Sequence, residues 1–122
     1  MSSKKEEEKL FTLPVSYIME QLQKTDEQIM GSELILQHFF DSQDQQSRFL
    51  IPMVVDILWL NYSIVRILTP HIENPTLVDN PDTGEREYIV DNSSLLGLQT
   101  LVLNRHHANN ELKRLSCSIA MH

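Results

Sequence analysis

Residues 49–68 have the sequence FLIPMVVDILWLNYSIVRIL, and this stretch decides the fold of the chain. At about 100° per residue on a helix, most of the polar side chains in and beside it fall within one narrow stripe. The stripe consists of Arg48, Pro52, Asp56, Ser63 and Arg66. The rest of the circumference is almost entirely apolar, and a helix of this kind has to be covered on most sides. Two further helices of a small chain cover only part of it, so we expect self-association or an obligate partner.

The length of this stretch is close to that of a membrane span. It contains Pro52 and also the charged residues Asp56 and Arg66. A charge near the centre of a span costs about 2.5–3.5 kcal/mol on insertion scales. The sequence therefore favours a deeply buried helix in a soluble assembly over a membrane span.

Periodic apolar residues predict two more long helices, one on each side of the central stretch. Before it, apolar residues recur every seven positions from Val15 to Leu36. After it, leucines line one side of a helix. Thr69-Pro70 is expected to end the central helix, because proline cannot continue the backbone hydrogen bonds. We predict three helices, over about residues 14–41, 45–69 and 93–119.

A β-hairpin is expected between the second and third helices, over about residues 76–90. Two short β-prone runs flank the segment Asn80-Pro81-Asp82-Thr83-Gly84-Glu85, which has strong turn chemistry. An isolated hairpin is marginally stable in water. We therefore expect this one to pack on the helices or to pair with another subunit.

The chain of 122 residues has the length of one domain. Residues 1–10 form a charged run that we expect to be a disordered tail, and residues 11–122 a single helical domain. The predicted fold class is mainly α, a bundle of three long helices with a β-hairpin inserted between the second and third.

Charge and cysteine content limit the partners and the compartment. The formal net charge is −7, and only residues 92–122 carry more basic than acidic side chains. An acidic protein repels nucleic acid, so a nucleic-acid partner is not expected. The single cysteine, Cys117, excludes an intrachain disulfide and fits a reducing cytoplasm, where we expect it to be buried and inert. The N-terminal run lacks the apolar segment of a secretory signal.

The predicted assembly is a homo-oligomer, most simply a dimer, joined through the helix at 45–69. Its candidate interface residues are Met53, Ile57, Trp59, Leu60, Asn61, Tyr62 and Ile64. Trp59 falls within the polar stripe, where an exposed aromatic side chain would mark a contact surface. Asn61 points away from the stripe, so if buried it needs a hydrogen-bond partner and would fix the packing register.

The third helix carries a second candidate site, a basic surface that would bind an anion. Its residues are Arg105, His106, Asn109, Lys113 and Arg114. Spacings of four place several of them on neighbouring stripes, as recognition of a phosphate group or a nucleotide would require. The alternatives are pairing with the acidic helix at 14–41 and plain solvation. No Gly-rich phosphate loop accompanies the basic residues.

Catalytic and metal-binding patterns are weak throughout the sequence. His106 and His107 are adjacent and point about 100° apart on a helix, so they cannot chelate one metal as an i, i+4 pair does. Cys117 is about 15 Å along the helix from both histidines, beyond hydrogen-bond reach. We expect no enzymatic activity, no cofactor and no metal site.

The sequence thus predicts a non-enzymatic protein–protein interaction module that acts as a cytoplasmic homo-oligomer. Its role would be that of an adaptor, an assembly chaperone, or a regulatory or inhibitory subunit for a second protein. The alternative is a protein that binds or sequesters a phosphate-bearing small molecule or nucleotide through the basic surface of its last helix.

Overall fold

The computed structural model describes residues 10–41 and 48–120. Its elements follow one another as β1 (Leu10–Pro14), α2 (Val15–Asp41), α4 (Ile51–Glu73), β2 (Leu77–Asp79), β3 (Arg86–Asp91) and α5 (Asn92–Ala120). The predicted class is confirmed: the protein is a mainly α bundle of three long helices, with a hairpin between the second and third.

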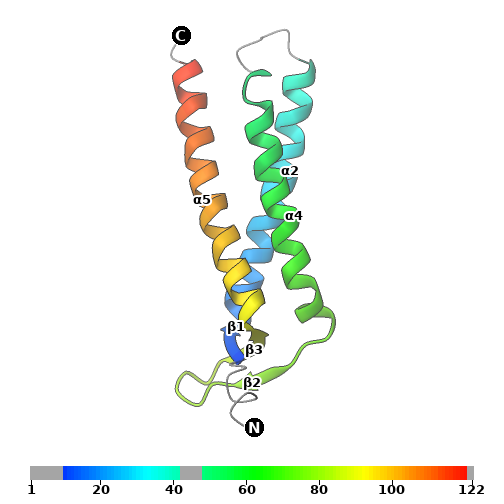
Figure 1. Ribbon diagram of the computed structural model, residues 1–122, viewed down its shortest axis with the longest axis vertical. Coiled ribbons are helices and arrows are strands. Elements are labelled where there is room, and N and C mark those ends of the chain that lie inside the picture. Colours follow the sequence, from blue (N-terminus) through cyan, green and yellow to red (C-terminus); the bar gives the residue numbers. More distant parts are fainter. Residues whose placement is uncertain (1–9, 42–47, 121–122) are drawn as a thin grey trace.

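The helices lie along the long axis of the molecule, and the small sheet closes one end (Figure 1). α2 and α5 start at this sheet end and run away from it, whereas α4 returns toward it. α4 packs against both α2 and α5, while α2 and α5 have little backbone contact with each other. The opposite end, where α2 and α5 finish and α4 begins, is called the distal end below.

The boundaries of α2 and α5 agree with the predicted ones to within one residue, and the end of α2 at Asp41 agrees fully. Residues 45–47, where the central helix was expected to start, lie outside the described residues. α4 itself begins at Ile51, with Pro52 in its first turn. A proline is tolerated there because the first N–H groups of a helix have no intrahelical partner.

The predicted end of the central helix at Thr69-Pro70 is wrong, because α4 continues through Pro70 to Glu73. Proline removes one backbone hydrogen bond, that to the Arg66 carbonyl, and only one more turn of helix follows it. The Thr69 hydroxyl donates to the Val65 carbonyl at 2.7 Å. The Asn74 N–H donates to the Pro70 carbonyl at 3.1 Å, which closes the final turn.

The sheet contains one strand more than predicted. The disordered tail was expected over residues 1–10, but Leu10 already belongs to β1, and residues 1–9 lie outside the described residues. β1 pairs antiparallel with β3, with Leu10 opposite Asp91, and the strand order is β1-β3-β2. β3 is therefore the middle strand, and the sheet ties the start of α2 to the start of α5.

The hairpin of β2 and β3 is confirmed, and its turn has the predicted chemistry. The Asn80 side chain accepts the N–H of Asp82 at 2.8 Å and that of Thr83 at 3.3 Å. Gly84, with φ of 74°, donates its N–H to the Asn80 carbonyl at 2.8 Å. Residues with a side chain rarely adopt this φ, which is why glycine stands here.

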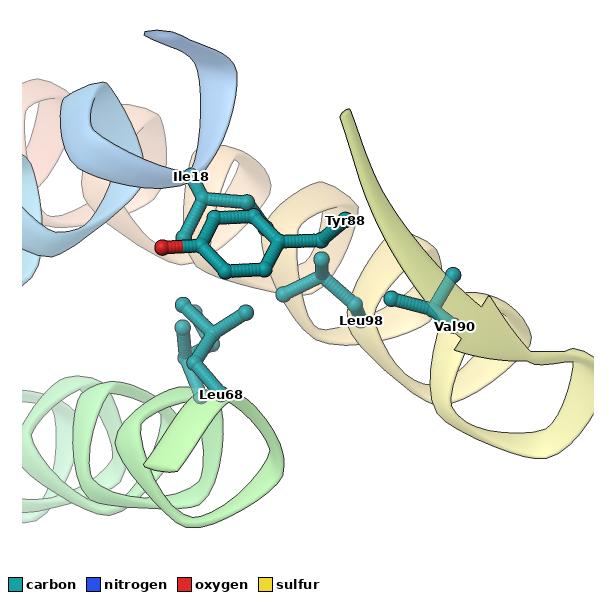
Figure 2. Close-up of a cluster of buried hydrophobic side chains, with 6 residues drawn as sticks. Ile18, Leu68, Tyr88, Val90 and Leu98 are labelled. Atoms are coloured by element: carbon teal, nitrogen blue, oxygen red, sulfur yellow. The ribbon is translucent and has the colours of Figure 1, made fainter. Parts of the chain in front are cut away.

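The main apolar core lies at the sheet end. Tyr88 of β3 reaches between Ile18 of α2, Leu68 of α4 and Leu98 of α5, and Val90 continues the cluster (Figure 2). Full burial of side chains of this size contributes about 1.5–3 kcal/mol each. The three helices are therefore held most firmly next to the sheet.

The predicted polar stripe faces outward, since Asp56 and Arg66 of α4 are exposed, and so is Arg48, which precedes the helix. Among the described residues, α4 is the helix that is long and apolar enough to cross a membrane. Core helices of soluble proteins have the same length and composition. Here the face of α4 opposite the stripe packs against α2 and α5.

Candidate functional site

A charged side chain, that of Arg105, is buried in the middle of the bundle. It is only 4% exposed. Positions 98, 101, 105, 108 and 112 share one face of a helix, so Arg105 interrupts the apolar row of α5. The same helical repeat that buries Leu98 at the sheet end therefore directs Arg105 toward the other two helices.

Three hydrogen bonds join the Arg105 guanidinium to α2 and α4. Nη1 donates to Thr25 Oγ1 at 2.8 Å and to Asn61 Oδ1 at 2.9 Å, and Nη2 donates to Gln21 Oε1 at 2.7 Å. Asn61, which is fully buried, also donates from Nδ2 to the Ile57 carbonyl at 2.9 Å. Polar side chains from all three helices thus meet at one level of the bundle.

Gln28 extends this polar network toward the surface. Its Oε1 accepts from Asn61 Nδ2 at 3.2 Å and from Asn109 Nδ2 at 3.1 Å. In the part of the chain that the structure describes, every side-chain nitrogen and oxygen that is completely enclosed has a hydrogen-bond partner. The network is therefore a specific arrangement that fixes how the three helices pack.

The acceptors around Arg105 are all neutral. They are the amide oxygens of Gln21 and Asn61 and the hydroxyl of Thr25. Burial lowers the pKa of the Arg105 guanidinium, because water that would stabilise the charge is removed, and the nearby Tyr17 acts in the opposite direction. Arginine stays protonated in proteins even so. A positive charge that no carboxylate of the described residues binds therefore lies inside the bundle.

A small polar cavity of about 130 Å³ opens beside Arg105, between α2 and α5. We name it the Arg105 pocket. Its lining consists of Gln21, Lys24, Gln28, Val102, Arg105, His106 and Asn109. None of these residues is acidic, and three of them have basic side chains.

The Arg105 pocket is one section of a longer groove between α2 and α5. A second cavity shares Gln28 and Asn109 with it. A third cavity, of about 300 Å³, shares Ile35 and Leu112 with the second. Figure 1 shows α5 leaning away from α2 and α4 toward its C-terminal end. We name the third cavity the distal groove, lined by Leu34, Ile35, His38, Phe39, Leu112 and Ser116.

Large apolar side chains remain exposed on the helices. They include Met19, Met30, Leu34 and Phe40 of α2, Trp59 and Tyr62 of α4, and Leu96 and Leu103 of α5. Leu34, on the wall of the distal groove, is 66% exposed. Exposed apolar side chains that lie together are typical of protein interaction sites, and Met30 and Leu34 line one shallow cavity on α2.

The predicted interface residues of the central helix divide into three groups. Those buried inside the chain itself are Ile57, Asn61 and Ile64. Those half-buried are Met53 and Leu60. Trp59 and Tyr62 are exposed, with Trp59 at 66%, as its position in the polar stripe predicted. The surface that α4 offers to a partner is narrower than the sequence suggested, because α2 and α5 cover its buried face.

The predicted anion-binding residues are also divided. Arg105 lies inside the bundle instead of on a basic surface, because it occupies a position in the apolar row of α5. His106 and Asn109 line the Arg105 pocket. Lys113 and Arg114 are exposed and do not line it, and Arg114 forms an ion pair with Glu111 on its own helix.

The α2 side of the pocket was missed by sequence reasoning. Gln21, Lys24 and Gln28 line it but were not among the candidate site residues. A usable signal was present, because Thr25 and Ser32 stand at inward positions of the seven-residue repeat, and both are buried. Polar residues at inward positions of two helices, opposite an arginine in an apolar row, indicate a buried network.

Other chemistry gains little support from the arrangement. No group of three or more metal-ligating side chains comes together among the described residues. Cys117, expected to be buried, is exposed near the C-terminal end of α5. The rings of His106 and His107 have centroids 5.9 Å apart and planes tilted by 55°.

Comparison with protein-family models, with curated proteins and with solved structures gave no match for this chain. The argument for a function therefore rests on the groove, on the buried charge and on the exposed apolar side chains.

Proposed function

We propose that this protein is a non-enzymatic interaction module that works as a homodimer joined through the distal groove. In this role it serves a larger assembly as an adaptor, an assembly chaperone or a regulatory subunit. The observation that carries the proposal is the groove itself, because Leu34 and Ile35 of α2 face Leu112 of α5 with no further element of the described chain between them.

The apolar surface beside the groove gives a reason for association. Met30 and Leu34, one turn apart on α2, form an apolar row beside it, and both are more than 60% exposed. Burying one such side chain contributes about 1.5–3 kcal/mol. A partner that covers the groove and this row therefore gains free energy from several side chains at once.

Charge favours a second copy of the chain as the occupant. Glu27 lies along the α2 side of the groove. Lys113 is exposed on α5. A twofold axis parallel to the helices places α2 of one copy opposite α5 of the other, so acidic and basic side chains face each other. The interface is then isologous, as in most homodimers.

Sedimentation equilibrium at micromolar concentration tests the proposal. The wild-type protein is expected to have the mass of a dimer, and Leu34→Glu that of a monomer. Leu34 is exposed, so this change should leave the fold intact, which circular dichroism verifies. Val78→Glu is the matched control, because Val78 is an exposed apolar residue of β2 remote from the groove, and it should remain dimeric.

Two results would overturn the distal groove as the interface. One is a wild-type protein that stays monomeric at tens of micromolar. The other is a dimer that survives Leu34→Glu but dissociates with Trp59→Glu. That second result would move the contact to the exposed stripe of α4, where sequence reasoning first placed it.

A further inference from the structure

We propose that the Arg105 pocket binds a small oxyanion, a phosphate or carboxylate group, on Arg105, Lys24 and His106. The pocket and the distal groove are different sections of the α2/α5 groove, and the observations for each are independent. The inference therefore goes beyond dimer formation and gives the protein a ligand.

Arg105 has unused hydrogen-bonding capacity. Its three hydrogen bonds account for three of the five N–H groups of a guanidinium, and the Nε–H has no acceptor among the described residues. The residue is 4% exposed and lines the pocket. A buried charge without a counter-charge is costly, and an anion in the pocket would supply the missing opposite charge.

The amide side chains present donors to the pocket. Gln21 and Gln28 both use their Oε1 atoms as acceptors, from Arg105 and from two asparagines. Their NH₂ groups make no hydrogen bond within the described residues, and an amide NH₂ can only donate. The acceptor oxygens of the two glutamines are thus used within the network, and their NH₂ groups are available to donate to a ligand.

Two basic side chains stand at the rim. Lys24 Nζ lies 3.3 Å from Glu20 Oε1, and both side chains are more than half exposed, so water weakens this pair. His106 Nε2 lies 3.2 Å from Asn110 Nδ2. When that amide donates, the neutral imidazole carries its proton on Nδ1, which is then a further donor.

The size of the cavity selects the class of ligand. About 130 Å³ is below the roughly 300–1,000 Å³ of pockets that enclose whole drug-sized ligands. One phosphate or carboxylate group fits, and a nucleotide does not fit inside. A larger molecule would enter with its anionic group only and leave the remainder along the groove or in solvent.

Titration with sodium phosphate and, separately, with sodium acetate tests the inference. Amide chemical shifts and the Tm are recorded, with sodium chloride at matched ionic strength as the reference. We expect saturable shifts at the pocket residues and a rise in Tm that chloride does not produce. The arm that saturates at lower concentration identifies the preferred oxyanion.

Variants locate the site. Lys24→Gln, a change at an exposed side chain, should weaken binding about tenfold, which corresponds to the loss of one charged contact. Arg66→Gln is the control, because Arg66 is an exposed basic residue of α4 that lines neither the pocket nor the distal groove, and it should bind as the wild type does. Arg105→Lys should abolish saturation, and if that variant does not fold, Lys24→Gln and its control still decide.

Three results would overturn the oxyanion site. One is that chloride has the same effect as phosphate and acetate, and another is that the chemical shifts change without saturating. The third is that wild type and Lys24→Gln bind with equal affinity. The same titration on Leu34→Glu separates it from the proposed dimer, because Leu34 does not line the pocket. If Leu34→Glu binds the oxyanion saturably, the site is supported even where the dimer proposal fails.

Discussion

Arg105 is part of the architecture as well as a candidate ligand-binding residue. Its guanidinium bonds to Gln21 and Thr25 of α2 and to Asn61 of α4, so one side chain connects three helices. Hydrogen bonds to a charged group contribute about 1.5–3 kcal/mol each, against the cost of removing the charge from water. The three hydrogen bonds thus stabilise the buried charge. A substitution of Arg105 removes a hydrogen-bond donor from Gln21, Thr25 and Asn61 at once.

Arg105→Met should destabilise the protein by about 2–4 kcal/mol in urea unfolding. The apolar side chain fills the space but leaves the acceptors of Gln21, Thr25 and Asn61 buried without a donor. Arg66→Met is the control, because Arg66 is exposed on α4 and its loss should cost less than about 0.5 kcal/mol. Equal stabilities of the two variants would contradict the structural role of Arg105.

Asp91 gives the fold a pH dependence through the start of α5. Its carboxylate accepts the Ser94 N–H at 3.1 Å and the Ser94 hydroxyl at 2.6 Å, and these bonds lower the pKa of Asp91 from 3.8. A lowered pKa in the folded state means that the stabilisation is complete above the unfolded-state pKa. It is lost as the pH falls through the lower, folded-state value.

Asp91→Ala should therefore cost about 1 kcal/mol at neutral pH, the usual effect of removing a helix cap. The difference from the wild type should shrink as the pH falls below about 4, where the wild-type carboxylate also becomes protonated. Urea unfolding along a pH series measures it. Asp79→Ala is a suitable control, because both Asp79 and its partner Arg86 are exposed. A gap that stays constant down to pH 2 would refute the assignment.

At the scale of elements, the helices could be predicted because their signal is local. The apolar repeats of α2 and α5 gave boundaries within one residue of those observed. β1 was missed because it is short and its partner β3 lies more than 70 residues away in the sequence. Its alternation of Phe11, Thr12 and Leu13 was the available sign, yet three residues alone do not define a strand.

Replacing glycine by alanine is expected to change the stability of the protein in opposite directions at two positions. An added Cβ at Gly31, inside α2, meets no atom within 4 Å, so Gly31→Ala should stabilise the protein by about 0.5–1 kcal/mol through helix propensity. Gly84 has φ of 74° in the hairpin turn, so Gly84→Ala should destabilise it by about 1 kcal/mol. Thermal unfolding of both variants gives the signs, and equal signs would contradict one of the two local conformations.

At the scale of the whole molecule, packing changes along the long axis. The sheet end has the apolar core of Tyr88 and its neighbours, and the middle has the network of Arg105. The distal end keeps the groove, because Leu112 and Leu115 of α5 are only half-buried there. The packing of α5 against the other helices therefore becomes weaker with distance from the sheet.

The residues of the candidate site could be predicted only in part, because their surroundings depend on how the helices pack. Spacing along one helix correctly grouped Arg105 and Asn109, but it placed them on a surface. Which face of α5 turns inward depends on where α2 and α4 lie, and a single helix does not contain that information. Lys24 belongs to the pocket only because α2 and α5 run side by side, which is a property of the tertiary fold.

The weaker packing of α5 at the distal end predicts an uneven pattern of amide hydrogen exchange in dilute protein. Amides of α5 over residues 110–117 should exchange at least tenfold faster than those over residues 98–105, because few buried side chains hold the distal part. α4 is the internal control, since Val54 and Ile57 are buried at the same end and should remain protected. Raising the protein concentration should slow exchange over residues 110–117 if a second copy covers the groove. Uniform exchange along α5 at every concentration would show that the distal part is held as firmly as the core, and neither the gradient nor the dimer would then stand.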